Sequence, residues 1–440
     1  MIKCQRIGLT PAGAAKITLM AISSIISRLD VTLDDLFFQP LQRCVESLSW
    51  RRHCPKFDDD SWLRMGVWRV LDEAGSGRGF LQENCLNFPS LPSVRNYFYS
   101  FCSERRAHMV TELNEMILQS AAQSFGDRLA DIPELATYEL FAIDGHWHSG
   151  ATHDPKSSEK KVATGHFYSL DLRRHTLRDL AVNEYHKEND MHVLKRLKPT
   201  GLRQGVARGK RVLNVYDRAG IDFEYWRRCQ KECAVYFLSR VKDGMVFEWL
   251  YEMDFDPKDP RNAGVQRDDR VHTKNNISLR VITYIEPETG KVFEFLTNVM
   301  DLPPGVMVEL YRRRWEIEKV FDDLKNKLHQ KKSWSSDLTA KQCQGQLIAL
   351  TYNLIRLVEE RLQQEHGLVN QVEEERKGKE RQKIKEKANA QGRAVSTLLL
   401  NACQATQRSV KFIRWLRGGL RKNVTAATAL PRLASLYAEI

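Results

Sequence analysis

Hydrophobic and polar residues follow two different periods along the chain. In the first 135 residues, and again after residue 301, apolar residues recur every three or four positions, a spacing typical of amphipathic helices. Between residues 138 and 300 the apolar residues form short runs separated by polar and turn-forming residues, which indicates strands. The pattern therefore predicts a helical N-terminal region, a strand-rich middle and a helical C-terminal region.

Three helices are expected in the N-terminal region: Val31–Trp50, Ser61–Gly75 and a longer helix over roughly 93–124. The third interleaves basic and aromatic side chains, which are Arg95, Tyr97, Phe98, Tyr99, Phe101, Arg105, Arg106 and His108. Such a mixture suits a surface that docks a DNA backbone. It suits a packed helix with one solvated face equally well, so both interpretations stay open.

The strand-rich middle begins with a short apolar run that ends in Asp144 and is followed by a glycine. This run predicts a buried strand with Asp144 at its C-terminal end. Two further β-like runs, at 164–172 and 176–182, are separated by a short polar turn. Together the three runs predict an antiparallel meander.

A second apolar run, at 211–217, also ends in a carboxylate, Asp217. Helical patterns at 184–197 and 222–231 flank it, and another strand is expected at 234–241. The resulting order, β-β-β-α-β-α-β, is that of a ribonuclease-H-like α/β fold with a mixed sheet. If the two central strands lie side by side, Asp144 and Asp217 come within a few ångströms of each other.

More β-like runs follow at 245–250, 277–285 and 291–300, with a polar loop at 261–274. They predict a β-rich insertion between the last strand of the core and the next helix.

That next helix, Tyr311–Lys325, carries an apolar stripe that suits packing on a core. A second stripe beside it holds Tyr311, Arg314, Glu318 and Lys325, spaced i, i+3, i+7 and i+14, so they share an arc of roughly 60°. One interpretation is a solvated face with ion pairs such as Arg314–Glu318. The two upstream aspartates favour another, in which Glu318 completes an acidic triad beside cations, as in a metal and phosphate site.

The charge and composition narrow the choice of partner. A formal net charge of +12 suggests a polyanionic partner. No apolar run is long enough for a membrane span, and the N-terminal segment does not resemble a signal peptide. The nine scattered cysteines fit a reducing cytosol. His146, His148 and His153 follow Asp144, but we expect an exposed loop there and not a zinc site.

The combination of Asp144, Asp217 and the Tyr-x2-Arg-x3-Glu-x6-Lys helix resembles the IS4-type DDE transposases of bacterial insertion sequences. The family signature is matched at Tyr311, Arg314, Glu318 and Lys325 in both residue type and spacing. The segments Asp217–Asp222 and Phe295–Asn298 are similar to the family as well. The resemblance covers roughly residues 90–360 and is weak at both ends of the chain.

The resemblance implies an enzyme that hydrolyses DNA at element ends and transfers the strand into target DNA. Asp144, Asp217 and Glu318 would be catalytic and would bind two Mg²⁺ ions, with Mn²⁺ as a substitute. Tyr311, Arg314 and Lys325 would hold the DNA backbone. A tryptophan of the β insertion can stack on a displaced base in this family, and Trp249 is the candidate here, although a core position is the more common explanation for a tryptophan.

The implied partner is double-stranded DNA, both the terminal inverted repeats of the element and the target. Because two ends must be brought together, we expect a homodimer on DNA, in a bacterial cytoplasm at the nucleoid. Two alternatives from other classes remain: a catalytically silent DNA-binding relative, and a ribonuclease-H-like nuclease without strand transfer.

The expected organisation has five parts. It comprises a helical region at 1–135 for DNA end recognition, the first part of the catalytic core at 136–241, a β insertion at 242–300, core helices at 301–365, and a charged linker with a helical module at 366–440. The charged segment 372–387 is expected to be either an exposed helix or a disordered linker.

Overall fold

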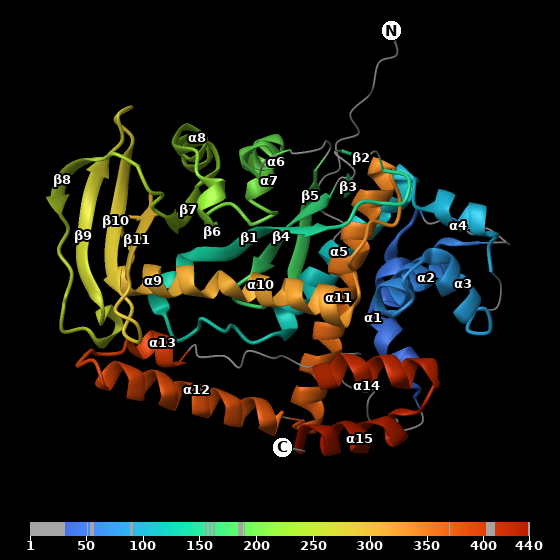
Figure 1. Ribbon diagram of the computed structural model, residues 1–440. Coiled ribbons are helices and arrows are strands. Elements are labelled where there is room, and N and C mark those ends of the chain that lie inside the picture. The colour runs from blue at the N-terminus through green and yellow to red at the C-terminus, as the bar shows by residue number, and fades with distance from the viewer. Residues whose placement is uncertain are drawn as a thin grey trace, which may run out of the picture.

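The computed structural model describes residues 31–50, 52, 57–88, 91–154, 156–157, 160–161, 163–183, 188, 190–368, 370–401 and 410–438 (Figure 1). Its centre is a nine-stranded mixed sheet in the order β5-β4-β1-β6-β7-β11-β10-β9-β8. The strands are β1 (Tyr138–His148), β4 (Thr164–Asp171), β5 (Leu177–Val182), β6 (Arg211–Val215), β7 (Val235–Arg240), β8 (Glu248–Glu252), β9 (Val265–His272), β10 (Ser278–Ile285) and β11 (Val292–Thr297). The short strands β2 (Lys156–Ser157) and β3 (Lys160–Lys161) pair only with each other.

The first five strands of the large sheet have ribonuclease-H-like topology. β1, β4 and β5 form an antiparallel meander, and β6 and β7 continue the sheet parallel to β1. This confirms the predicted fold class. The strand that carries Asp144 is longer than predicted, because β1 goes on pairing with β4 as far as His148 after its pairing with β6 has stopped at Ala142. Asp144 therefore lies inside a strand and not at its end.

Strands β8–β11 extend the same sheet instead of forming a sheet of their own. β11 runs antiparallel to β7 and joins the two parts. β8 is the outer edge, and all five of its residues are exposed.

Helices cover both faces of the sheet, with a separate core under each set. One face packs on α6 (Asp190–Arg196), α7 (Lys198–Leu202) and α8 (Phe223–Cys233). The other packs on α9 (Pro304–Arg313), α10 (Trp315–Asp322) and α11 (Leu338–His366). Of the N-terminal helices, α1 (Leu33–Ser47), α2 (Asp59–Leu71) and α5 (Glu104–Ser124) pack against α11, and α3 (Gly77–Glu83) packs on α4 (Val94–Ser100).

The predicted helix at 93–124 is two helices, because Ser103 starts a new one. Its hydroxyl accepts a hydrogen bond from the backbone N–H of Arg106, which is the usual action of an N-terminal cap.

The helix predicted over Tyr311–Lys325 is also interrupted. At Arg314 the backbone tightens, with i to i−3 hydrogen bonds from Arg314 to Tyr311 and from Ile317 to Arg314, both of 3.1 Å. After Asp322 it widens into a π-helical turn at Asp323–Lys327, closed by a bond from Leu328 to the carbonyl of Asp323. These two irregularities change the directions of the side chains that the uniform helix would have aligned.

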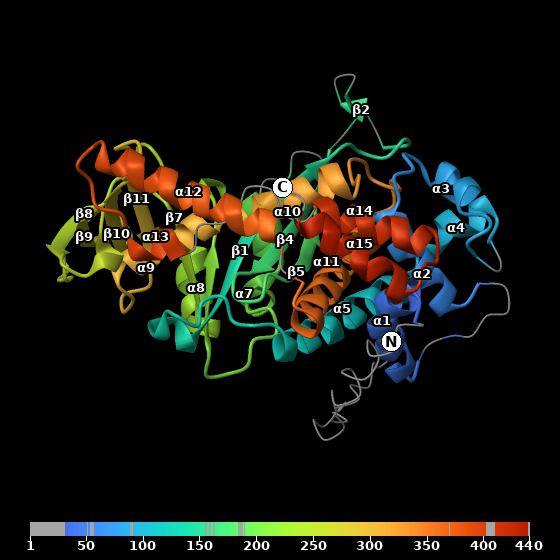
Figure 2. The same ribbon diagram turned by 90° about the horizontal axis from the view of Figure 1, so that it is seen from below.

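The C-terminal region contains α12 (Gln371–Asn389), α13 (Thr397–Asn401), α14 (Val410–Arg421) and α15 (Ala426–Ala438). Figures 1 and 2 show α12 crossing from the α14–α15 pair to the β10–β11 end of the sheet, where Lys387 pairs with Glu288. Only Ile384 and Ala388 of α12 are buried. Of the two predicted states of this charged segment, the structure adopts the exposed helix.

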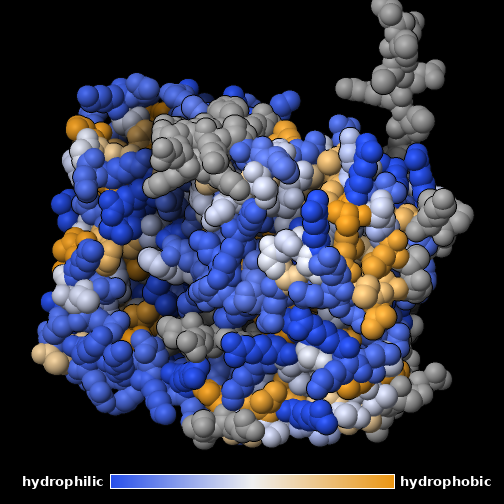
Figure 3. Space-filling model, turned by 45° about the vertical axis from the view of Figure 1, so that its right-hand side comes forward, coloured by the Kyte–Doolittle hydropathy of each residue, from blue (hydrophilic) through white to orange (hydrophobic). Residues whose placement is uncertain are grey.

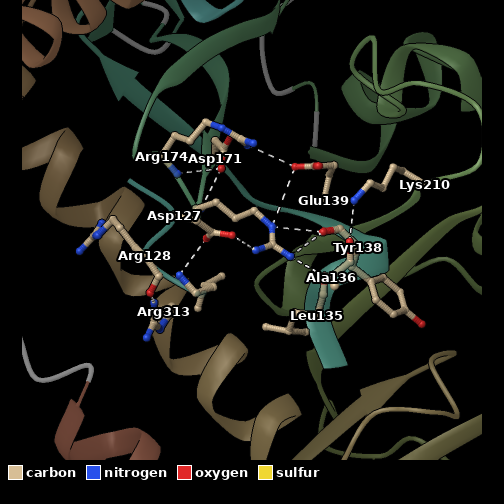
Figure 4. Close-up of polar contacts among 12 residues, drawn as sticks. Asp127, Arg128, Leu135, Ala136, Tyr138, Glu139, Asp171, Arg174, Lys210 and Arg313 are labelled. Carbon is tan, nitrogen blue, oxygen red and sulfur yellow. Dashed lines mark hydrogen bonds and ion pairs between the residues drawn. The ribbon is translucent and has the colours of Figure 1, made fainter. Parts of the chain in front are cut away.

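A buried arginine, Arg173, anchors the start of β1. It donates to the backbone carbonyls of Leu135 and Tyr138 and forms an ion pair with Asp127. Figure 4 shows these contacts, together with the hydrogen bond from Arg313 of α9 to the carbonyl of Arg128. The network fixes the N-terminal end of the strand that carries Asp144 against the segment after α5.

Within the described ranges, no helix combines the length and apolar character that crossing a bilayer requires. The face of the molecule in Figure 3 is mainly hydrophilic, with a hydrophobic area on its right-hand side. The N-terminal segment compared above with a signal peptide lies outside the described residues.

Candidate active site

The register of the central strands brings the two predicted aspartates together. Ala142 of β1 is paired with Val215 of β6 in parallel register, so Asp144 and Asp217, two residues further along each chain, are in equivalent positions. Neighbouring strands are about 4.8 Å apart. Since Ala142 and Val215 belong to the core under α9–α11, both carboxylates face these helices.

Local hydrogen bonds orient both aspartates. The Asp144 carboxylate accepts a bond of 2.8 Å from the N–H of Gly145, and the Asp217 carboxylate accepts one of 2.7 Å from the N–H of Ala219. Ser239 of β7 donates to the backbone carbonyl of Asp217, at 2.8 Å, and holds the end of β6 against β7.

Arg314 joins the third acid to the first. Its guanidinium donates a bond of 3.1 Å to Asp144 and one of 2.7 Å to Glu318. The side chain of Arg314 is buried, whereas Glu318 is about one-third exposed. Asp144 and Glu318 are thus held on one guanidinium, beside Asp217.

The pKa of Asp144 reflects the proximity of the three carboxylates. Burial raises the pKa of Asp144 to about 6, opposed by Arg314 and by the Gly145 hydrogen bond, and the charges of Asp217 and Glu318 add to the rise. Three carboxylates therefore repel one another at this point, which is the environment that a bound cation would stabilise.

The remaining signature residues lie on either side of this point. Tyr311 is nearly buried, with its ring 4.9 Å from that of Phe295, and burial raises its pKa. Lys325 is exposed, and its charge acts on His146 and His148, further along β1 than Asp144. Lys325 lies within the π-helical turn Asp323–Lys327, one element beyond Glu318 of α10.

Asp322 is another acid on α10, one turn beyond Glu318. Its carboxylate accepts from Asn326 at 2.6 Å and lies 3.7 Å from the ammonium of Lys327. It is therefore engaged along its own helix, whereas Glu318 shares Arg314 with Asp144.

Trp249 lies on the edge strand β8, not in the core. Its side chain is half-exposed, and the guanidinium of Arg267 lies 5.4 Å from the ring centroid. Five strand intervals separate β8 from β6, on the order of 24 Å along the sheet. Trp249 also pairs with Val271, which belongs to the core under α8, so it lies on the face opposite to Asp217. It stays a predicted DNA contact, but separate from the carboxylates.

The histidines after Asp144 do not form the exposed loop that we expected. His146 and His148 are buried on β1 and face His166 of β4, with ring centroids of His148 and His166 5.0 Å apart. The expectation failed because β4 and the overlying helices cover this part of β1. Only His153 lies in an exposed turn.

Two residues near the site were not predicted from the sequence. Trp315 follows Arg314, is more than half-exposed, and lies 5.4 Å from the Arg314 guanidinium. Asp190, at the start of α6, is close enough to Asp217 that burial and this neighbouring charge raise its pKa. A tryptophan within a helical pattern could have drawn attention to Trp315. The sequence contains no comparable signal for Asp190.

The donor set suits a hard divalent cation, since it consists of carboxylate oxygens without thiols. As they stand, no three His, Cys, Asp or Glu side chains of the described chain are arranged to hold a metal ion. The reason at this site is that the Arg314 guanidinium lies between two of the carboxylates. The carboxylates therefore suit a divalent ion in their chemistry and in their proximity. For an ion to bind, the Arg314 guanidinium would have to move away from Asp144 and Glu318.

Comparison with known proteins gives one family. Residues 137–354 match the model of the transposase DDE domain. The match supports a DDE transposase family, and it includes Asp144, Asp217 and Glu318. The chain also resembles the piggyBac transposase in a cryo-EM structure of its synaptic complex with hairpin DNA, at 10% identity over 92% of this chain and 84% of that one, with a TM-score of 0.33. No curated protein matches the sequence.

Proposed function

We propose that the protein is a DNA transposase of IS4 type. Its DDE domain would cleave phosphodiester bonds at the ends of an insertion sequence and join those ends to target DNA. The observation that supports this most is the convergence of Asp144, Asp217 and Glu318 around Arg314, inside the matched domain.

In this proposal Asp144, Asp217 and Glu318 hold two divalent cations, Mg²⁺ or Mn²⁺. When bound, such ions stabilise the attacking and leaving oxygens of the phosphate and activate water or a 3′-hydroxyl. The burial of Asp144 limits the water around the reacting phosphate. Gly145 and Ala219 keep their hydrogen bonds to the two aspartates and fix the directions of the remaining oxygens.

Arg314 and Tyr311 are assigned to the DNA backbone. The planar guanidinium of Arg314 binds two oxygens at once, and it does so with carboxylates in this structure. In the complex with DNA, a phosphate of the strand would accept these hydrogen bonds from Arg314 in place of the carboxylates. Lys325, exposed beyond the carboxylates, would contact a phosphate further along, and Trp249 a more distant part of the duplex.

The partner in this proposal is double-stranded DNA, and the enzyme acts as a homodimer on two element ends. The N-terminal helices are the proposed end-recognition region. Arg95 and Tyr99 on α4 support this, because Tyr99 is exposed and the guanidinium of Arg95 lies 5.8 Å from its ring.

One observation favours the alternative of a silent DNA-binding relative, namely that Arg314 already neutralises two of the three acids. Incubation of supercoiled plasmid with the protein and magnesium separates the two. Nicking is expected of the transposase, and binding without nicking would support the silent relative. Joining of a labelled 3′-hydroxyl element end to target DNA then distinguishes a transposase from a nuclease without strand transfer.

A further inference from the structure

A third charged residue stands in the same row of the sheet as the two aspartates. Val215 of β6 is paired with Leu238 of β7 in parallel register, so Arg240 is in the position equivalent to Asp217. Leu238 belongs to the core under α9–α11, which places Arg240 on the same face as the carboxylates. The row Asp144, Asp217, Arg240 thus crosses three neighbouring strands, with about 4.8 Å between successive backbones.

Arg240 is held in place but lacks an anionic partner. Its guanidinium lies 4.6 Å from the ring centroid of Phe293. Its Nε is buried and has no hydrogen-bond partner among the described residues. Nor does any carboxylate in the described part of the chain form an ion pair with it.

The charges around Arg240 are largely of its own sign. Burial lowers the pKa of Arg240, and the charges of Arg218 and Arg314 lower it further, against the opposite effects of Tyr311 and Asp243. Among the residues that the structure describes, the one ion pair of Arg218, which follows Asp217, is a long contact of 3.9 Å with the fully exposed Asp243. Arg314 is engaged with two carboxylates, so Arg240 and Arg218 carry the uncompensated positive charge at this end of the row.

We propose that Arg240, with Arg218 beside it, binds a backbone phosphate of the DNA strand next to the phosphate that the carboxylates position. This inference rests on the proposed transposase function and adds to it a second phosphate position, outside the Tyr-Arg-Glu-Lys signature. Stacking on Phe293 sets the plane of the guanidinium, and a phosphodiester supplies the acceptor oxygens that the protein does not. Arg240 acts here as a binding residue that sets the register of the strand over the acids.

The test is the salt dependence of DNA binding, measured in EDTA so that no cleavage occurs. The variants are Arg240→Gln, Arg240→Lys and, as the matched control, Arg228→Gln, an exposed arginine on α8 over the opposite face. Each lost phosphate contact reduces the slope of log K against log salt by about 0.9. We expect this reduction for R240Q, and the wild-type slope for R240K and R228Q.

Thermal unfolding of the same variants separates binding from packing. A purely structural role on Phe293 would lower the unfolding temperature of R240Q and leave its slope equal to that of R228Q, which would overturn the proposal. A second result would also overturn the proposal: inorganic phosphate raises the unfolding temperature of the wild type but not of R240Q, while the salt slopes of DNA binding are equal in the two proteins. The site would then bind free phosphate and not the DNA backbone. A wild-type protein that does not bind DNA would instead refute the proposed function.

Discussion

Arg314, at the start of α10, donates a 3.1 Å hydrogen bond to Asp144 of β1, 170 residues earlier in the chain. The same guanidinium donates a 2.7 Å bond to Glu318. One buried cation therefore couples the strand that carries the first acid to the helix that carries the third.

Replacement of Arg314 by alanine leaves Asp144 and Glu318 facing each other without a cation. We expect Arg314→Ala to lower the free energy of unfolding by about 2 kcal/mol at pH 7. The loss is smaller at pH 5, because Asp144, whose pKa is already raised to about 6, then takes up a proton. Urea unfolding at the two pH values measures this, with Arg228→Ala as control. A loss of equal size at both would contradict the account.

Glu316 and Glu318 are two positions apart and have different roles. Glu316 is buried and pairs with Arg128 at 3.0 Å and His175 at 3.3 Å. We expect Glu316→Ala to lower the free energy of unfolding by about 3 kcal/mol, because it removes the carboxylate that pairs with the Arg128 guanidinium and the buried His175 ring. Glu318→Ala is expected to lower the free energy of unfolding by less, because the side chain of Glu318 is about one-third exposed. Chemical denaturation of both variants checks the order, and the reverse order would show that Glu318 is the structural residue.

The buried histidines make the fold sensitive to acid. Burial lowers the pKa of His146 to about 4 and that of His148 well below its usual value. An unfolded chain takes up these protons near pH 6.5, so stability is present above that pH and is lost below it, by up to about 1.4 kcal/mol per pH unit and residue. Asp144 has the opposite effect, since its pKa is raised.

Comparison of variants isolates the histidine contribution. The unfolding temperature of His148→Asn is expected to fall less steeply between pH 6.5 and 4 than that of the wild type, with His153→Asn as the control variant. Parallel curves for His148→Asn and the wild type would show that this histidine does not titrate with unfolding.

Two helical glycines provide a matched pair for packing. A Cβ at Gly345 of α11 would lie 2.5 Å from both Asp179 Oδ2 and His166 Nδ1, whereas at Gly378 of α12 it would meet no heavy atom within 4 Å. We expect Gly345→Ala to destabilise by about 1–3 kcal/mol through overpacking. Gly378→Ala should stabilise by about 0.5–1 kcal/mol through helix propensity. Thermal unfolding measures both, and a neutral Gly345→Ala would contradict the close packing of α11 on β4 and β5.

Local sequence pattern was sufficient for the central strands. The apolar runs that end near Asp144 and Asp217 predict strands without information from distant residues. The order of these strands in the sheet follows from the meander and the crossover helices. The breaks around Arg314 gave no such signal, because every residue from Tyr311 to Lys325 is compatible with a helix. The tightening is visible only when Arg314 contacts a strand from elsewhere in the chain.

Residues whose role depends on pairing between distant segments were missed for the same reason. Arg240 ends an ordinary apolar strand and gains its position beside Asp217 only from the β6–β7 register. His146 and His148 appear polar in sequence, and their burial depends on β4. The sequence favoured a core position for Trp249, and its exposure depends on β8 being an edge strand.

In the proposed function, Asp144, Asp217 and Glu318 act together on a DNA phosphate. Its most direct test is magnesium-dependent nicking of supercoiled plasmid by Glu318→Gln, with DNA binding and unfolding temperature measured on the same preparation. We expect nicking to be abolished while DNA binding and the folded state are largely retained. Nicking at the wild-type rate by this variant would contradict it.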